Sequence, residues 1–131
     1  MMMPIKQDII NDGWRMSANI NEALISRCCD EVKRAYLIPL FTEQEIADAA
    51  TTSTIAHAWN ALTFLRTLQD NAFSTRTGAE QKNFEQGTHV YRLDDVKKAC
   101  ARYVDELRET STKNGNIKDI CDIYFYTQFF N

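Results

Sequence analysis

Glycine and proline are scarce in this chain, which has 4 Gly and 2 Pro among 131 residues. β-Sandwiches, β-barrels and phosphate-binding loops need many of the backbone conformations that these two residues supply. Hydrophobic residues make up 44% of the chain and charged residues 25%, which is ordinary for a folded core. We therefore expect an all-α fold: a single-domain helical bundle of about four to five helices over residues 1–131, with one long loop.

Apolar residues recur at helical spacing in three segments, residues 19–37, 54–72 and 93–113. The stripes are too narrow for each helix to be stable alone, so the three helices should share one core. A Lys-Asn-Gly sequence at 113–115 is a stop signal for the third helix. The stripes predict that seven side chains are buried: Leu24, Val32, Leu62, Leu65, Cys100, Tyr103 and Leu107.

Capping signals indicate where two of the helices begin. Asn19 with Glu22 resembles a capping box for the first long helix, and Pro39 should end that helix. Thr42 with Glu45 forms the clearest capping box in the chain and predicts a short helix. Cap and helix dipole explain the acidic residues of this segment without any catalytic role.

Residues 71–92 carry no helical stripe, and we expect a long loop there, with a small hairpin over residues 73–77 as an open alternative. This loop is either a flexible insertion or an element that contacts a partner. The last segment, 117–131, should be a short helix or an aromatic tail, since five of the 14 aromatic residues lie in the last eight positions. The tail packs either on its own core or on another chain, and we assign it to a partner interface. The candidate interface residues are Arg76, Lys82, Phe84, Arg92, Tyr126, Phe129 and Phe130.

The formal charge of −3 and the absence of a basic segment argue against a sequence-specific nucleic-acid partner. The 4 cysteines have no metal-ligand spacing, so we expect reduced structural thiols, with no disulfide, metal or cofactor. His57 should be a capped or solvated side chain rather than a base. No catalytic motif occurs, so we expect a protein that is not an enzyme and has no catalytic residues. No apolar run is long enough for a signal sequence or a membrane span.

The order of these segments resembles the small helical head-to-tail connector, or neck adaptor, proteins of tailed bacteriophages and prophages. Four features carry the resemblance within residues 17–110: the helix ending in Ala-Tyr-Leu-Ile-Pro-Leu-Phe at 35–41, the acidic-capped segment with the second long helix, the loop around 75–78, and the helix over 98–107.

The resemblance implies a structural protein that binds the portal, forms a homo-oligomeric ring and extends the DNA channel toward a downstream neck or tail protein. It would occupy the virion neck, and the bacterial cytoplasm during assembly. Loops of this family approach neighbouring subunits or the channel, and the family brings no catalytic residues. An acidic surface suits a channel through which DNA must slide. The alternative from another class is a small cytoplasmic helical module for protein–protein interaction or regulation.

Overall fold

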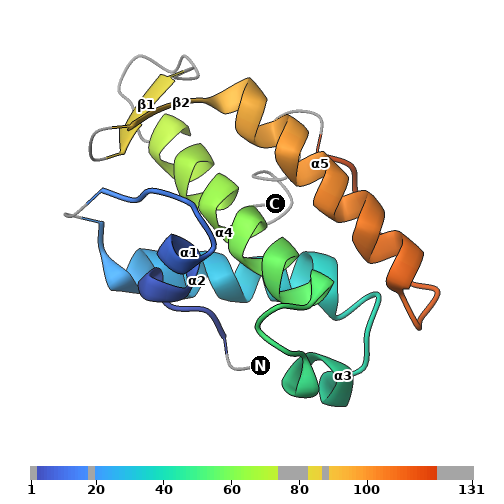
Figure 1. Cartoon of the computed structure of the whole chain (residues 1–131). Helices are drawn as coiled ribbons and strands as arrows, with labels where there is room; N and C mark the ends of the chain where they lie inside the picture. The colour runs from blue at the N-terminus through green and yellow to red at the C-terminus, as the bar shows by residue number, and fades with distance from the viewer. Residues whose placement is uncertain (1–2, 18–19, 74–82, 87–88, 121–131) are drawn as a thin grey trace.

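The computed structural model describes residues 3–17, 20–73, 83–86 and 89–120, and helices dominate it, which confirms the all-α class. One antiparallel hairpin accompanies the helices, with Phe84 opposite Tyr91. It lies where α4 ends and α5 begins, at the opposite end of the molecule from α3 (Figure 1). In chain order the elements are α1 (Lys6–Asn11), α2 (Glu22–Val32), the π-helical turn η1 (Lys33–Leu37), α3 (Glu43–Asp48), α4 (Thr54–Phe73), β1 (Asn83–Gln86), β2 (His89–Arg92) and α5 (Leu93–Thr110).

Helix α4 is the centre of the bundle and packs against α5, α2 and α1. Every residue from Ala58 to Gln69 is buried, so no face of this part of α4 meets solvent. The predicted core is mostly confirmed. Val32, Leu62, Leu65, Cys100 and Leu107 are buried. Two members of the list, Leu24 and Tyr103, are only half-buried because they lie at the margins of their stripes.

The first long helix begins later than predicted and changes pitch before its end. Asn21 is its N-cap, with a side chain that accepts a hydrogen bond from the Ala23 amide at 2.8 Å, whereas Asn19 lies outside the described residues. Near the end, the Ile38 amide donates to the Lys33 carbonyl five residues back, at 2.9 Å. Pro39 has no amide to donate and its ring displaces the preceding turn. The wider π turn accommodates that ring.

The capping box of α3 is confirmed in both directions. The Glu45 amide donates to Thr42 Oγ1 at 3.1 Å, and the Thr42 amide donates to Glu45 Oε1 at 2.9 Å. Phe41 and Ile46, which flank this box, are both buried. A short local sequence therefore defines this six-residue helix completely.

The segment 71–92 is less of a loop than we expected. Helix α4 continues to Phe73, and the hairpin occupies residues 83–92 rather than 73–77. Of that earlier hairpin assignment, residues 74–77 lie outside the described residues. Helix α1 had no counterpart in the sequence prediction because six residues with one buried side chain, Ile9, produce no recognisable stripe.

Helix α5 ends at Thr110, earlier than predicted, and the chain then crosses back over the turn that follows η1. The amides of Thr112 and Lys113 both donate to the Leu40 carbonyl, and the Gly115 amide donates to the Pro39 carbonyl at 3.1 Å. These donors satisfy the Pro39 and Leu40 carbonyls, which have no helical donor because the helix ends before them. The glycine serves this contact, not a helix stop.

Replacing Gly115 by alanine should destabilise the fold by about 1–3 kcal/mol. A Cβ at this position would lie 2.1 Å from the Pro39 carbonyl oxygen, and backbone on both sides must move to relieve the clash. Urea denaturation of Gly115→Ala against the exposed neighbour control Asn114→Ala measures the difference. Equal denaturation midpoints for the two variants would show that the fold accommodates a Cβ at position 115 without loss of stability.

Candidate assembly surfaces

The structure describes only part of the predicted interface. Arg92 is exposed and is the last residue of β2, directly before α5. Phe84 lies in β1, and its side chain is not described. The remaining candidates lie outside the described residues, so their role stays a prediction: Arg76, Lys82, Tyr126, Phe129 and Phe130.

Three aromatic rings fix the hairpin to the rest of the molecule. Trp14 stacks on Phe64 of α4 with centroids 4.9 Å apart, and Phe64 meets Tyr91 of β2 edge-on at 4.9 Å. The Arg15 amide donates to the Tyr91 hydroxyl at 2.9 Å. The hairpin and the start of α5 therefore have a defined position relative to the core.

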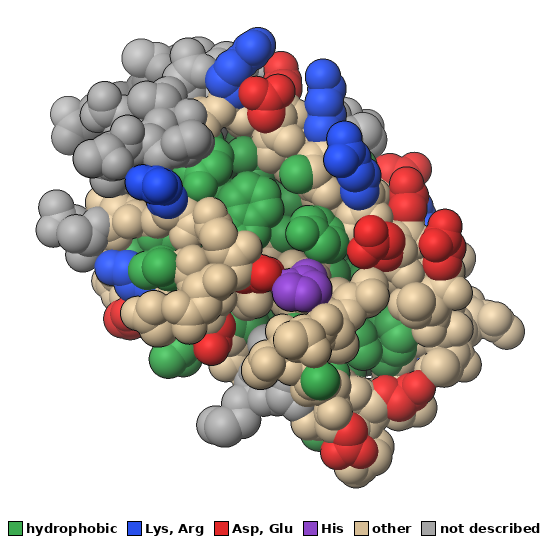
Figure 2. Space-filling view, viewed as in Figure 1, with side chains coloured by type: hydrophobic (Ala, Val, Ile, Leu, Met, Phe, Trp, Pro, Cys, Tyr) green, Lys and Arg blue, Asp and Glu red, His purple; other side chains and the backbone are tan. Residues whose placement is uncertain are grey.

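The outer face of α5 carries exposed side chains of both charges: Asp94, Asp95, Lys98, Arg102, Asp105, Glu106 and Glu109. Lys98 and Arg102 are both exposed and lie four residues apart, so they are neighbours on one face of the helix. Neither makes an ion pair with another of the described residues. Figure 2 shows Lys and Arg side chains in its upper half, with acidic side chains both among them and across the lower half.

A groove of about 450 Å³ lies at the other end of α5. Apolar Phe41, Ala49 and Ile55 line it together with the carboxylates of Glu45 and Asp48. Its full lining comes from α3, the start of α4 and the last turn of α5: Phe41, Gln44, Glu45, Asp48, Ala49, Ser53, Thr54, Ile55 and Thr110.

Glu45 is held in its ionised form. Its Oε1 accepts a hydrogen bond from Thr112 Oγ1 at 2.5 Å, and this bond, followed by the one from the Thr42 amide, lowers the pKa of the carboxyl. Asp48 is exposed. Sequence reasoning treated these acids as part of a helix start, and no local signal shows that they face a groove.

A second, polar cleft of about 340 Å³ lies between α1 and the start of α4. His57 Nδ1 is 2.8 Å from Asp12 Oδ1, and Asn60 Nδ2 donates to Asp12 Oδ2 at 3.3 Å. Sequence reasoning missed this cluster, although His57 and Asn60 three residues apart in an apolar helix were a usable signal. The hydrogen bonds join α1 to α4, so His57 has a structural partner.

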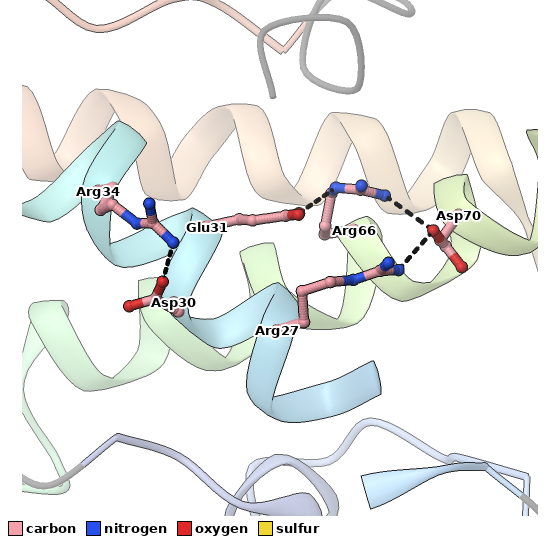
Figure 3. A network of polar contacts seen from close by, with 6 residues as sticks. All are labelled: Arg27, Asp30, Glu31, Arg34, Arg66 and Asp70. Carbon is pink, nitrogen blue, oxygen red and sulfur yellow. Dashed lines mark hydrogen bonds and ion pairs between the residues drawn. The ribbon is translucent and has the colours of Figure 1, made fainter. Parts of the chain in front are cut away.

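Buried charges join α2 to α4 (Figure 3). The Arg66 side chain has no exposed surface, and its Nε lies 2.7 Å from Glu31 Oε2. Asp70 lies 3.9 Å from Arg66 Nη1 and also accepts from Arg27 at 2.7 Å. Sequence reasoning did not identify this network. An arginine inside the apolar stretch of α4 was its only local sign.

Cys28, Cys29 and Cys100 are free and buried, and Cys121 lies outside the described residues. Burial raises the pKa of Cys28 to about 12 and that of Cys29 to about 11, and it raises the pKa of Cys100 as well. At neutral pH these three thiols are protonated, and so are poor nucleophiles and poor metal ligands.

We expect the free energy of unfolding to fall as the pH rises above about 8.5. Thiols of the unfolded chain ionise there, whereas the folded thiols of Cys28 and Cys29 stay protonated up to about pH 11–12, so the unfolded state binds fewer protons. Urea denaturation at about pH 7.5 and pH 9.5 measures the fall. Cys28→Ala should show a shallower fall, and an unchanged pH dependence in that variant would contradict the explanation.

Within the described residues, no three His, Cys, Asp or Glu side chains are placed to hold a metal ion. None of the described helices combines the length and hydrophobicity that a membrane span requires. No family model, curated protein or solved structure shows significant similarity to this chain.

Proposed function

We propose that the protein is a head-to-tail connector of a tailed phage or prophage. In this role it forms a homo-oligomeric ring on the portal, extends the DNA channel and contacts a downstream neck or tail protein. The sequence resemblance suggests the role. The observation that supports it is a pair of surfaces at opposite ends of α5, the hairpin fixed by Trp14, Phe64 and Tyr91 at its start and an open groove at its end.

A ring requires that one surface of each copy meets a different surface of the next copy. Helix α5 has 18 residues and is about 27 Å long, so the hairpin at its start and the groove at its end are well separated. The aromatic contacts of Trp14, Phe64 and Tyr91 hold the hairpin in place.

The test is to measure the mass of the purified chain by light scattering and native mass spectrometry, alone and with portal rings from the same genome. We expect one discrete oligomer that co-migrates with the portal. A chain that stays monomeric and does not bind the portal would contradict the proposal and favour the small helical interaction or regulatory module.

A further inference from the structure

We propose that the groove between α3 and the end of α5 binds the C-terminal segment, residues 121–131, of a second copy of this chain. The inference rests on the proposed ring and names its contact. Each copy supplies a C-terminal segment to one neighbour and a groove to the other, which is the head-to-tail arrangement that closes a ring. The C-terminal segment lies outside the described residues, and its sequence holds five aromatic side chains: Tyr124, Phe125, Tyr126, Phe129 and Phe130.

The groove offers apolar surface to aromatic side chains. Phe41, Ala49 and Ile55 line it, and its volume of about 450 Å³ lies within the roughly 300–1,000 Å³ of pockets that bind small ligands. An occupant of such a pocket is comparable in size with one or two aromatic side chains. Aromatic side chains bury about 150–250 Å² each, so they gain more than other residues from contact with apolar surface.

Apolar surface, and not charge, selects this occupant. The C-terminal segment has one charged side chain, Asp122, and no lysine or arginine. The two carboxylates at the groove already accept hydrogen bonds from side chains of their own copy: Glu45 from Thr112, and Asp48 from Gln44. The occupant therefore does not have to bring a counter-charge.

The chain reaches the C-terminal segment along the flank of α5 that faces away from the groove. Arg108 Nη2 donates to the Ile117 carbonyl at 3.1 Å, and Arg108 Nη1 lies 2.7 Å from Asp119 Oδ1. Successive residues of an α-helix are rotated by about 100°, so Arg108 and the groove-lining Thr110 lie about 160° apart around α5. The segment thus starts on the opposite side of α5 from the groove of its own copy.

The outer surface of α5 lies between this start and the groove of the same copy. That surface carries the exposed carboxylates of Asp105, Glu106 and Glu109, which offer no apolar contact to an aromatic segment. Fully extended, the 11 residues of the segment span about 36–40 Å, compared with about 27 Å for the whole of α5. The groove of a neighbouring copy is therefore within reach.

The first test removes aromatic side chains from the C-terminal segment. Phe129→Ser with Phe130→Ser should weaken self-association by about tenfold or more, because burial of each Phe ring contributes to the association. The matched control, Thr127→Ser with Gln128→Ser, alters the same segment and keeps its aromatic residues, so it should assemble as the wild type does. Light scattering over a concentration series measures the association, and circular dichroism melting verifies that each variant is folded.

The second test fills the groove. Ala49→Trp places a ring in the groove and should weaken self-association to a similar extent. Ala47→Trp is the matched control, since Ala47 is an exposed residue of α3 that does not line the groove. It should leave the association unchanged.

A third measurement locates the contact and distinguishes two copies from one. Light protein with a photo-cross-linking phenylalanine analogue at position 129, mixed with excess heavy-isotope wild type, should form cross-links to residues 41–55 of the heavy protein. Assembly that survives the Phe129 and Phe130 substitutions, or cross-links to light protein alone, would overturn this inference and leave the ring standing. A wild-type chain with neither self-association nor portal binding would overturn the ring and this contact together.

Discussion

Replacing Arg66 by alanine should lower the free energy of unfolding by about 3–5 kcal/mol. The substitution leaves the Glu31 carboxylate, whose side chain is only 10% exposed, without its partner at 2.7 Å. A buried charge without a partner loses its hydration and gains nothing in return. Glu31→Ala should be similarly costly because it leaves the guanidinium group buried.

The double variant Arg66→Met with Glu31→Met separates loss of the pair from loss of packing. It should be more stable than either alanine variant, since no unpaired charge remains in the core. Arg34→Ala is the matched surface control, because its ion pair with Asp30 is exposed and should contribute less than about 1 kcal/mol. Urea denaturation compares the free energies of unfolding of these four variants. An Arg66→Ala midpoint close to that of Arg34→Ala would contradict the importance of the buried pair.

Replacing Phe64 by alanine should cost about 3–5 kcal/mol and should also release the hairpin. Phe64 is fully buried and its ring contacts both Trp14 and Tyr91. Loss of the Phe64 aromatic ring leaves a cavity and removes the contact that joins β2 to α4. Hydrogen exchange of the β2 amides should therefore accelerate more than exchange in α2.

Tyr91→Phe is the milder companion variant. It keeps the ring contact with Phe64 and removes only the hydroxyl that accepts from the Arg15 amide, so the expected loss is about 1 kcal/mol. If Phe64→Ala leaves the exchange of the β2 amides unchanged, the aromatic contacts do not position the hairpin.

Local signals predicted the helical part of the fold well. The Thr42–Glu45 capping box lies within four residues, so the sequence alone located α3. The stripes of α4 and α5 repeat over many turns and were equally clear. The π turn was not predicted, because a proline such as Pro39 predicts the end of a helix but not the pitch of its last turn.

The remaining features depend on residues far apart in the chain. The hairpin is held through Tyr91 by Trp14 and Phe64, and the groove forms only when Thr110 meets α3. The role of Gly115 was misassigned for the same reason, since the Pro39 carbonyl that it contacts is 76 positions earlier. No periodicity or capping rule reports such contacts.

Electron microscopy of the chain mixed with portal rings from the same genome shows whether the chain assembles on the portal. We expect a closed ring of this chain stacked coaxially on the portal. Bare portal rings beside a monomeric chain would contradict it.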